Sequence, residues 1–273
     1  MVGPKAKRIA ALKVIERFRV SKSQACRVLG LNRSTIDYKE TPKNEESLRT
    51  RMIELCERYR RFGCPRIHWF LNKEALVINY KRTERIYREM GLQLKNRKKK
   101  KRSNVIRIPL PKASFENQIW SMDFIHDRLE SGRKLKILNV VDDYTKICVG
   151  QMVASSITGE DLIKFFCGFK KLPFWIRCDN GPEFWANSFQ RWADKKLHFD
   201  FIDPGKPTQN AYIESFNGRF RDECLNENLF YSVEHAEQLI KKWRKEYNEN
   251  RPHSALGMKT PKEFAGEKKT VII

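Results

Sequence analysis

Three acidic residues that are far apart in the chain have the type and the setting needed to bind a divalent metal ion. Asp123 interrupts the mostly apolar run 118–125, Asp179 ends the apolar run 173–179, and Glu214 lies where a helix is expected to begin. An unpaired carboxylate is costly to bury in a strand, so we expect Asp123 to have a partner. Two strand-borne Asp residues and one helical Glu would together form an all-oxygen site, which suits Mg²⁺ or Mn²⁺.

The elements around these acids predict how they are positioned. Strands are expected over 118–125, 134–142, 147–155, 173–178 and 198–202. Helices are expected from Thr158 to about 169, over about 184–195, and from about Ala211 onwards. Three strands followed by alternating helices and strands is the order of an RNase H-like α/β domain, which has a mixed five-stranded sheet with flanking helices. Ligands of such domains gather beyond strand ends.

Other polar residues near the predicted site have simpler explanations. Glu183 is interpreted as a cap of the helix that it opens, in preference to a metal ligand. Asp142 and Asp143 end a strand and are interpreted as turn formers. His126 and His198 are interpreted as packing or surface residues.

The charge of the chain is strongly positive and unevenly distributed. Its formal net charge is +22, and residues 1–104 hold 29 Lys and Arg against 10 Asp and Glu. A basic N-terminal part followed by a near-neutral C-terminal part indicates a polyanion-binding region joined to a catalytic or structural domain. A generally basic, soluble surface is the alternative.

Residues 1–41 are predicted to form a helix-turn-helix. Ser21 or Ser23 can cap a helix, and Gly30 permits the turn. The second helix then offers Arg33 to a DNA groove. A plain helical hairpin is the alternative interpretation.

Residues 44–94 are predicted to form a second helical DNA-binding unit. Its last expected helix, from Lys81 to Met90, is amphipathic and carries three candidate DNA contacts, Lys81, Arg82 and Arg85. A solvated helix face is the alternative.

Residues 95–117 are predicted to be a basic linker that lies along DNA. Its candidate DNA contacts are the consecutive residues Lys98, Lys99, Lys100 and Lys101.

Cysteine usage and hydropathy predict the compartment. Seven scattered Cys without a CxxC pair indicate reduced thiols, as in a cytosolic protein. No apolar run approaches the length of a transmembrane helix, and the N-terminus lacks a signal-peptide core. We therefore expect a cytoplasmic protein that associates with the nucleoid when bound to DNA and has no membrane partner.

Three motifs carry a resemblance to a known family. They are Trp-Ser-Met-Asp-Phe from residue 120, Arg-Cys-Asp-Asn-Gly-Pro-Glu-Phe from residue 177, and Pro-Gly-Lys-Pro-Thr-Gln-Asn-Ala-Tyr-Ile-Glu-Ser-Phe-Asn-Gly from residue 204. They resemble the DDE integrase core, and most closely the B-frame (OrfB) transposases of bacterial insertion sequences. The resemblance spans nearly the whole chain, with the catalytic core expected over 118–230 and a C-terminal helix and tail over 231–273.

The resemblance implies direct transesterification of phosphodiester bonds at two metal ions. Asp123 would bridge both ions, with Asp179 and Glu214 each on one side. It also implies that Arg221, seven residues after Glu214, holds DNA near the metals, with Asn217 in a weaker DNA-binding role. Glu214 follows Asp179 by 35 positions, one fewer than is usual in the family.

The resemblance also implies partners. They are double-stranded DNA of the element ends and of the target, further copies of the chain in a multimer, and an upstream A-frame product as fusion or partner. Two alternatives stay open: an RNase H-like nuclease without strand transfer, and a non-catalytic DNA-binding repressor or inactive element relic. The presence of all three acids and Arg221 argues against the relic.

Overall fold

The protein is described by a computed structural model that covers residues 3–38, 45–95, 112–179, 181, 184, 186–201 and 210–269. The chain divides into two compact units, residues 1–47 and residues 48–273. Within the described residues, no helix is both long and apolar enough to span a lipid bilayer.

The first unit contains three short helices, α1 (Pro4–Phe18), α2 (Lys22–Leu29) and α3 (Arg33–Ile36). Ser21 caps α2 through a reciprocal capping box with Gln24, as its position before the helix predicts. Gly30 ends α2 with φ of +59°, a left-handed conformation that favours glycine. A small apolar cluster that includes Ala11 and Cys26 holds the three helices together.

The second unit begins with a helical part, α4 (Glu46–Arg58), α5 (Cys64–Lys73) and α6 (Tyr80–Glu89). The residues of this part that face inward recur at helical spacing and form one apolar core. Pro65 lies in the first turn of α5, and the Asn79 side chain caps α6. The helix α5 ends before Ala75, whose φ of +57° a helix cannot accommodate.

A five-stranded sheet forms the centre of the second unit, in the order β3-β2-β1-β4-β5. The strands are β1 (Ile119–Arg128), β2 (Lys134–Asp142), β3 (Cys148–Ala154), β4 (Trp175–Cys178) and β5 (His198–Phe201). The first three are antiparallel neighbours, while β4 pairs with β1 and β5 with β4 in parallel. The predicted mixed five-stranded sheet is therefore confirmed, with β1 at its centre.

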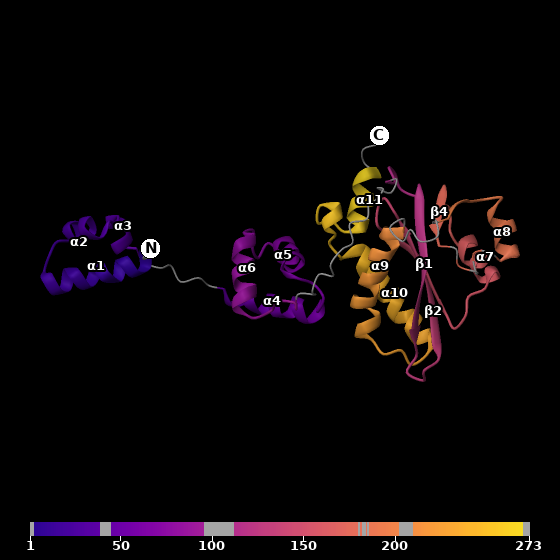
Figure 1. Cartoon of the computed structure of the whole chain (residues 1–273), viewed down its shortest axis with the longest axis horizontal. Coiled ribbons are helices and arrows are strands. Elements are labelled where there is room, and N and C mark those ends of the chain that lie inside the picture. Colours follow the sequence, from indigo (N-terminus) through magenta and orange to yellow (C-terminus); the bar gives the residue numbers. More distant parts are fainter. Residues whose placement is uncertain are drawn as a thin grey trace, which may run out of the picture. The chain divides into compact units, whose positions relative to one another are not determined.

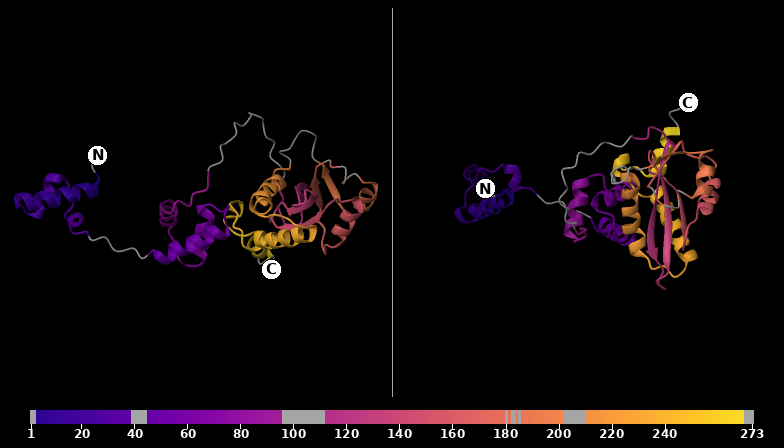
Figure 2. Two further views of the ribbon diagram at one scale, coloured as in Figure 1. Left: turned by 90° about the horizontal axis from the view of Figure 1, so that it is seen from below. Right: turned by 45° about the vertical axis from the view of Figure 1, so that its right-hand side comes forward.

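Helices cover both faces of the sheet (Figure 1). One face packs against α7 (Gly159–Cys167) and α8 (Asn187–Ala193), and the other against α9 (Ala211–Glu223) and α10 (Val233–Glu249). Side chains along β1 alternate between the two cores, so that Met122 faces α7 while Ile125 faces α9. Figure 2 shows the same layers from two further directions.

The end of the chain packs on the core and contains a second helix that was not predicted. The Asn248 side chain, near the end of α10, accepts a hydrogen bond from the Cys148 backbone N–H (2.9 Å) and donates one to its carbonyl (3.0 Å), at the start of edge strand β3. After the short 3₁₀ turn η3 (Ser254–Leu256), the chain forms α11 (Pro261–Lys269). Another 3₁₀ turn, η2 (Leu225–Glu227), follows α9.

Candidate active site

Strand pairing brings Asp123 and Asp179 to matching positions. β1 and β4 are parallel neighbours in which Ser121 pairs with Arg177. Asp123 and Asp179 each follow two residues later, so both carboxylates belong to the same face of the sheet. Asp179 lies just beyond the end of β4 and is exposed, whereas Asp123 is half-buried within β1.

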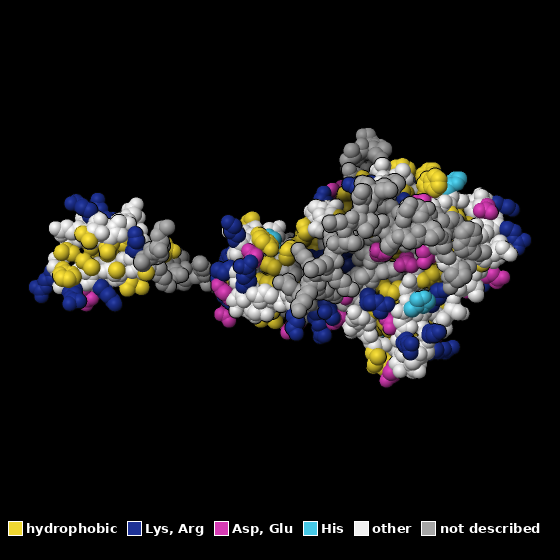
Figure 3. All heavy atoms as spheres, viewed as in Figure 1, with side chains coloured by type: hydrophobic (Ala, Val, Ile, Leu, Met, Phe, Trp, Pro, Cys, Tyr) yellow, Lys and Arg dark blue, Asp and Glu magenta, His cyan; other side chains and the backbone are white. Residues whose placement is uncertain are grey.

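Helix α9 brings the third acid to this face. Ile213, Phe216 and Phe220 on α9 pack into the core that Ile125 also joins, which directs α9 across the Asp123 side of the sheet. Glu214 lies in the first turn of α9 and is exposed. Figure 3 shows acidic side chains gathered on one face of the second unit, while Lys and Arg are scattered over the surface around them.

The environment of Asp123 changes its acidity. Burial raises the pKa of Asp123 most, and the charge of Asp179 and, more weakly, that of Glu214 also raise it. Hydrogen bonds from the Phe124 backbone N–H and the Asn217 side chain oppose the rise, and the resulting pKa is about 6. Like charges act in this way only when they are close enough to repel. Asp179 and Glu214 therefore lie close enough to Asp123 for their negative charges to act on its carboxylate.

The chemistry of these ligands fits a divalent cation such as Mg²⁺, which prefers carboxylate oxygens. Among the described residues, no group of three Asp, Glu, His or Cys side chains is arranged so that it could already hold a metal ion. Mg²⁺ is commonly bound by one or two carboxylates, with waters and substrate phosphates as the remaining ligands. Asp123 together with one of the other two acids would supply that number of carboxylates.

Asn217, one of the predicted DNA contacts, lies beside Asp123. Its side chain is buried, and its Nδ2 donates a hydrogen bond to Asp123 Oδ2 at 2.8 Å. Its Oδ1 accepts a hydrogen bond from Asn139 Nδ2 at 2.7 Å. The side chain is thus turned inward to Asp123, because both ends of the amide are engaged there. No sequence motif indicated Asn139, which comes from β2 and is 78 positions away in the chain.

Arg177 supports the end of β4 through buried charge. Its Nη1 lies 3.3 Å from Asp143 Oδ2, and its Nε donates to Asp200 Oδ2 at 2.9 Å. Asp142, predicted to form a turn, accepts hydrogen bonds from the backbone N–H groups of residues 144 and 145. Asp143 has a second role that the sequence did not reveal, as the partner of Arg177. Glu183 lies outside the described residues.

Arg221 is on α9 and reaches the end of β1. Its Nη2 donates to the His126 carbonyl oxygen at 2.7 Å, and its Nη1 lies 3.7 Å from Asp127 Oδ2. The side chain remains 41% exposed. The Arg221 guanidinium is therefore fixed in position but accessible to solvent, two helical turns along α9 from Glu214.

The remaining predicted DNA contacts lie on the helical parts. Arg33 is exposed at the start of α3 and donates to Ser23 Oγ at 3.2 Å. On α6, Lys81 is exposed, Arg82 is half-buried, and Arg85 pairs with Glu89 at 2.7 Å. The predicted contacts Lys98, Lys99, Lys100 and Lys101 lie outside the described residues.

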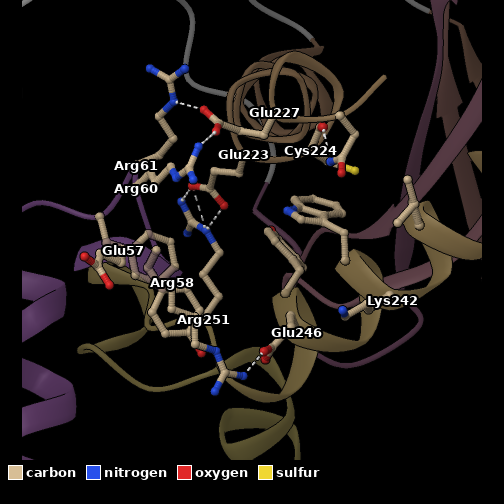
Figure 4. Close-up of a pocket in the computed structure, with 16 residues that line it drawn as sticks. Glu57, Arg58, Arg60, Arg61, Glu223, Cys224, Glu227, Lys242, Glu246 and Arg251 are labelled. Atoms are coloured by element: carbon tan, nitrogen blue, oxygen red, sulfur yellow. Dashed lines mark hydrogen bonds and ion pairs between the residues drawn. The ribbon is translucent and has the colours of Figure 1, made fainter. Parts of the chain in front are cut away.

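A cavity of about 560 Å³ lies elsewhere in the second unit, between residues 57–62 and the ends of α9 and α10 (Figure 4). Several of its charges are paired: Arg58 contacts Glu246, and the buried Arg251 donates to Glu223 from Nε and Nη2, with Nη2 at 2.6 Å. Its described lining includes none of the three acids. We therefore place the candidate active site at Asp123.

Comparisons with known proteins agree with this geometry. Integrase core domain families match residues 113–207 and 195–261, and an HTH-like domain family matches residues 43–100. The insertion element IS407 uncharacterized 31.7 kDa protein of Burkholderia multivorans is 43% identical, over 92% of this chain and 93% of its own length. The insertion element IS476 uncharacterized 39.2 kDa protein of Xanthomonas euvesicatoria is 40% identical, over 98% of this chain and 79% of its own length. The transposase for insertion sequence element IS904 of Lactococcus lactis is 26% identical, over 75% of this chain and 87% of its own length. The chain therefore belongs to the family of insertion-element transposases that carry an integrase core domain.

Proposed function

We propose that this transposase cuts the DNA ends of its insertion element and joins them to target DNA at a site formed by Asp123, Asp179 and Glu214. The observation that supports the proposal is the electrostatic effect on Asp123, whose pKa is raised first by burial and then by the charges of Asp179 and Glu214. A divalent cation bound beside Asp123 would offset this unfavourable negative charge.

In this proposal Asp123 would be the ligand common to two Mg²⁺ or Mn²⁺ ions, and Asp179 and Glu214 would each be a ligand of one of them. Such ions neutralise the charge that develops on the phosphate and acidify the attacking water or DNA 3′-hydroxyl. Asn217 orients Asp123 through its hydrogen bond to Oδ2. Arg221, held by the His126 carbonyl yet exposed, binds a backbone phosphate beside the acids.

In this proposal, the N-terminal helical parts of the chain bind DNA. Arg33 and the basic residues of α6 contact the element ends, and the lysines at 98–101 follow the backbone. The protein works in the bacterial cytoplasm as a homo-multimer that holds both element ends, and an upstream A-frame product serves as fusion or partner. These assignments rest on the charge distribution of the chain and on the family.

A strand-transfer assay with labelled element ends and Mg²⁺ tests the proposal. Asp123→Asn, Asp179→Asn and Glu214→Gln should each lower joining at least about a hundredfold, because transition-state charge loses its stabilisation. DNA binding in a gel shift should persist. Glu237→Gln, an exposed acid on α10, is the matched control and should retain full activity.

Two outcomes would contradict the proposal. If the wild-type protein only nicks its substrate, the chain is a nuclease without strand transfer. If it binds the ends but neither nicks nor joins them in Mg²⁺ or Mn²⁺, it is a non-catalytic DNA-binding protein.

A further inference from the structure

Three side-chain amides form a hydrogen-bonded chain that runs from the edge of the sheet to Asp123. Gln151 on β3 donates from Nε2 to Asn139 Oδ1 at 2.7 Å. Asn139 on β2 donates from Nδ2 to Asn217 Oδ1 at 2.7 Å, and Asn217 on α9 donates from Nδ2 to Asp123 Oδ2 at 2.8 Å. Strand register explains the alignment, since Asn139 pairs with both Asp123 and Gln151 across the sheet.

The donor-to-acceptor direction of these three hydrogen bonds is set by the last acceptor, the Asp123 carboxylate. An ionised carboxylate only accepts hydrogen bonds, so Asn217 must turn its NH₂ group toward Asp123. Its oxygen then faces Asn139, which must in turn present NH₂ to Asn217 and its own oxygen to Gln151. Each orientation follows from the one before it, and Gln151 is left as the donor that starts the chain.

Burial makes the hydrogen bonds between these amides costly to break. Asn139 is fully buried and Asn217 nearly so, and Gln151 Oε1 is a buried acceptor without a hydrogen bond among the described residues. An amide that flipped here would set two acceptors or two donors against each other away from water. The Asp123 carboxylate is also fixed at its other oxygen, because Oδ1 accepts from the Phe124 backbone N–H at 2.8 Å. Each oxygen thus has one donor and retains a lone pair for another ligand.

We propose that Gln151 and Asn139 are positioning residues that lock Asn217, and through it the Asp123 carboxylate, in the orientation that receives a divalent cation. The inference rests on the proposed function, in which Asp123 is a cation ligand. Neither amide touches the reacting groups. Their contribution is to keep a donor on one Asp123 oxygen and to prevent the carboxylate from rotating.

Gln151→Glu tests the direction of the chain. The new carboxylate cannot donate to Asn139 Oδ1, so Asn139 must turn its NH₂ group toward residue 151. Asn217 must then follow, which places its oxygen against Asp123. Gln151→Met removes the donor without reversing the chain and has nearly the same length. Gln238→Glu, at an exposed position on α10, makes the same change of net charge at a remote place and serves as the control.

Binding of Mn²⁺ to the DNA-free full chain, followed by electron paramagnetic resonance, is the first readout. Loss of a partner that orients a metal ligand typically weakens metal binding by about tenfold or more, which is the effect expected for Gln151→Glu. Gln151→Met should weaken binding by roughly two- to threefold, since orientation is loosened but not reversed. Gln238→Glu should bind Mn²⁺ as the wild type does. Equal affinities of Gln151→Glu and Gln238→Glu would overturn the proposal.

Strand transfer gives the second readout. The Mg²⁺ concentration for half-maximal joining should rise in Gln151→Glu, while the rate at saturating Mg²⁺ returns close to that of the wild type. A merely structural role would lower the melting temperature and the maximal rate and leave the metal requirement unchanged, which would also overturn the inference.

Two further measurements keep the result interpretable. If Gln151→Glu does not fold, hydrogen exchange of the Asn217 side-chain amide in Gln151→Met replaces it. That exchange should be faster than in the wild type, and an unchanged rate would overturn the proposal. Asp123→Asn separates the two ideas: if it binds Mn²⁺ as tightly as the wild type, the proposed function itself fails.

Discussion

Asp123→Asn should stabilise the metal-free protein in a way that depends on pH. Folding raises the pKa of Asp123 from its ordinary value of 3.8 to about 6, mainly through burial. An acid whose pKa is raised by folding destabilises the fold whenever it is ionised. That contribution is absent below about pH 4, grows between about pH 4 and pH 6, and is complete above pH 6. The shift of about two units corresponds to roughly 3 kcal/mol, as an upper value.

Chemical denaturation in the presence of a chelator measures this difference. The free energy of unfolding of Asp123→Asn minus that of the wild type should rise by up to about 3 kcal/mol between about pH 3.5 and pH 7.5. The hydrogen bond that Asn cannot accept at position 123 adds a loss that does not vary with pH, so the slope isolates the carboxylate. For Glu237→Gln, the free energy of unfolding should vary with pH as it does in the wild type. A difference between Asp123→Asn and the wild type that does not vary with pH would refute the raised pKa of Asp123.

Three further predictions concern the stability of the fold. Arg177→Met removes the partner of the buried Asp143, so thermal denaturation should show a loss of roughly 3 kcal/mol near neutral pH. That loss should shrink in acid, because the pKa of Asp143 is raised to about 6 by burial and a protonated carboxyl needs no cation. Gly150→Ala places a Cβ 2.6 Å from the Phe165 ring and should cost roughly 1–3 kcal/mol in urea unfolding, unless that ring finds room elsewhere. Ser21→Ala removes the cap of α2 and should lower the stability of the first unit by about 1 kcal/mol, which circular dichroism would detect.

The longer elements of the core were predictable because their residues alternate or recur regularly. The predicted strand 134–142 coincides with β2, since its side chains pack against one core or the other along most of its length. Shorter elements were less well predicted. The strand expected from residue 173 begins at Trp175, because Phe174 is exposed and contacts Phe115 instead of continuing the strand. The helix α11 was missed, as its sequence has no strong apolar stripe.

The candidate site was only partly predictable for a related reason. The three acids were found because each interrupts or ends an apolar run, and because the motifs around them resemble those of a family. The amides that surround Asp123 carry no such signal. Asn139, Gln151 and Asn217 become neighbours only through strand register and the packing of α9, which depend on pairs separated by up to 94 positions. Polar residues are also expected at solvent-facing positions of a strand, so the sequence does not distinguish Asn139 and Gln151 from surface residues.

The central claim is that Asp123, Asp179 and Glu214 share divalent cations while DNA is joined. The most direct test is anomalous diffraction from crystals of the protein with element-end DNA and Mn²⁺. We expect Mn²⁺ peaks within coordination distance of Asp123 and of at least one of the other two carboxylates, about 2.0–2.3 Å from the ligand oxygens. Mn²⁺ bound only at other places in a complex that is competent for joining would contradict the account.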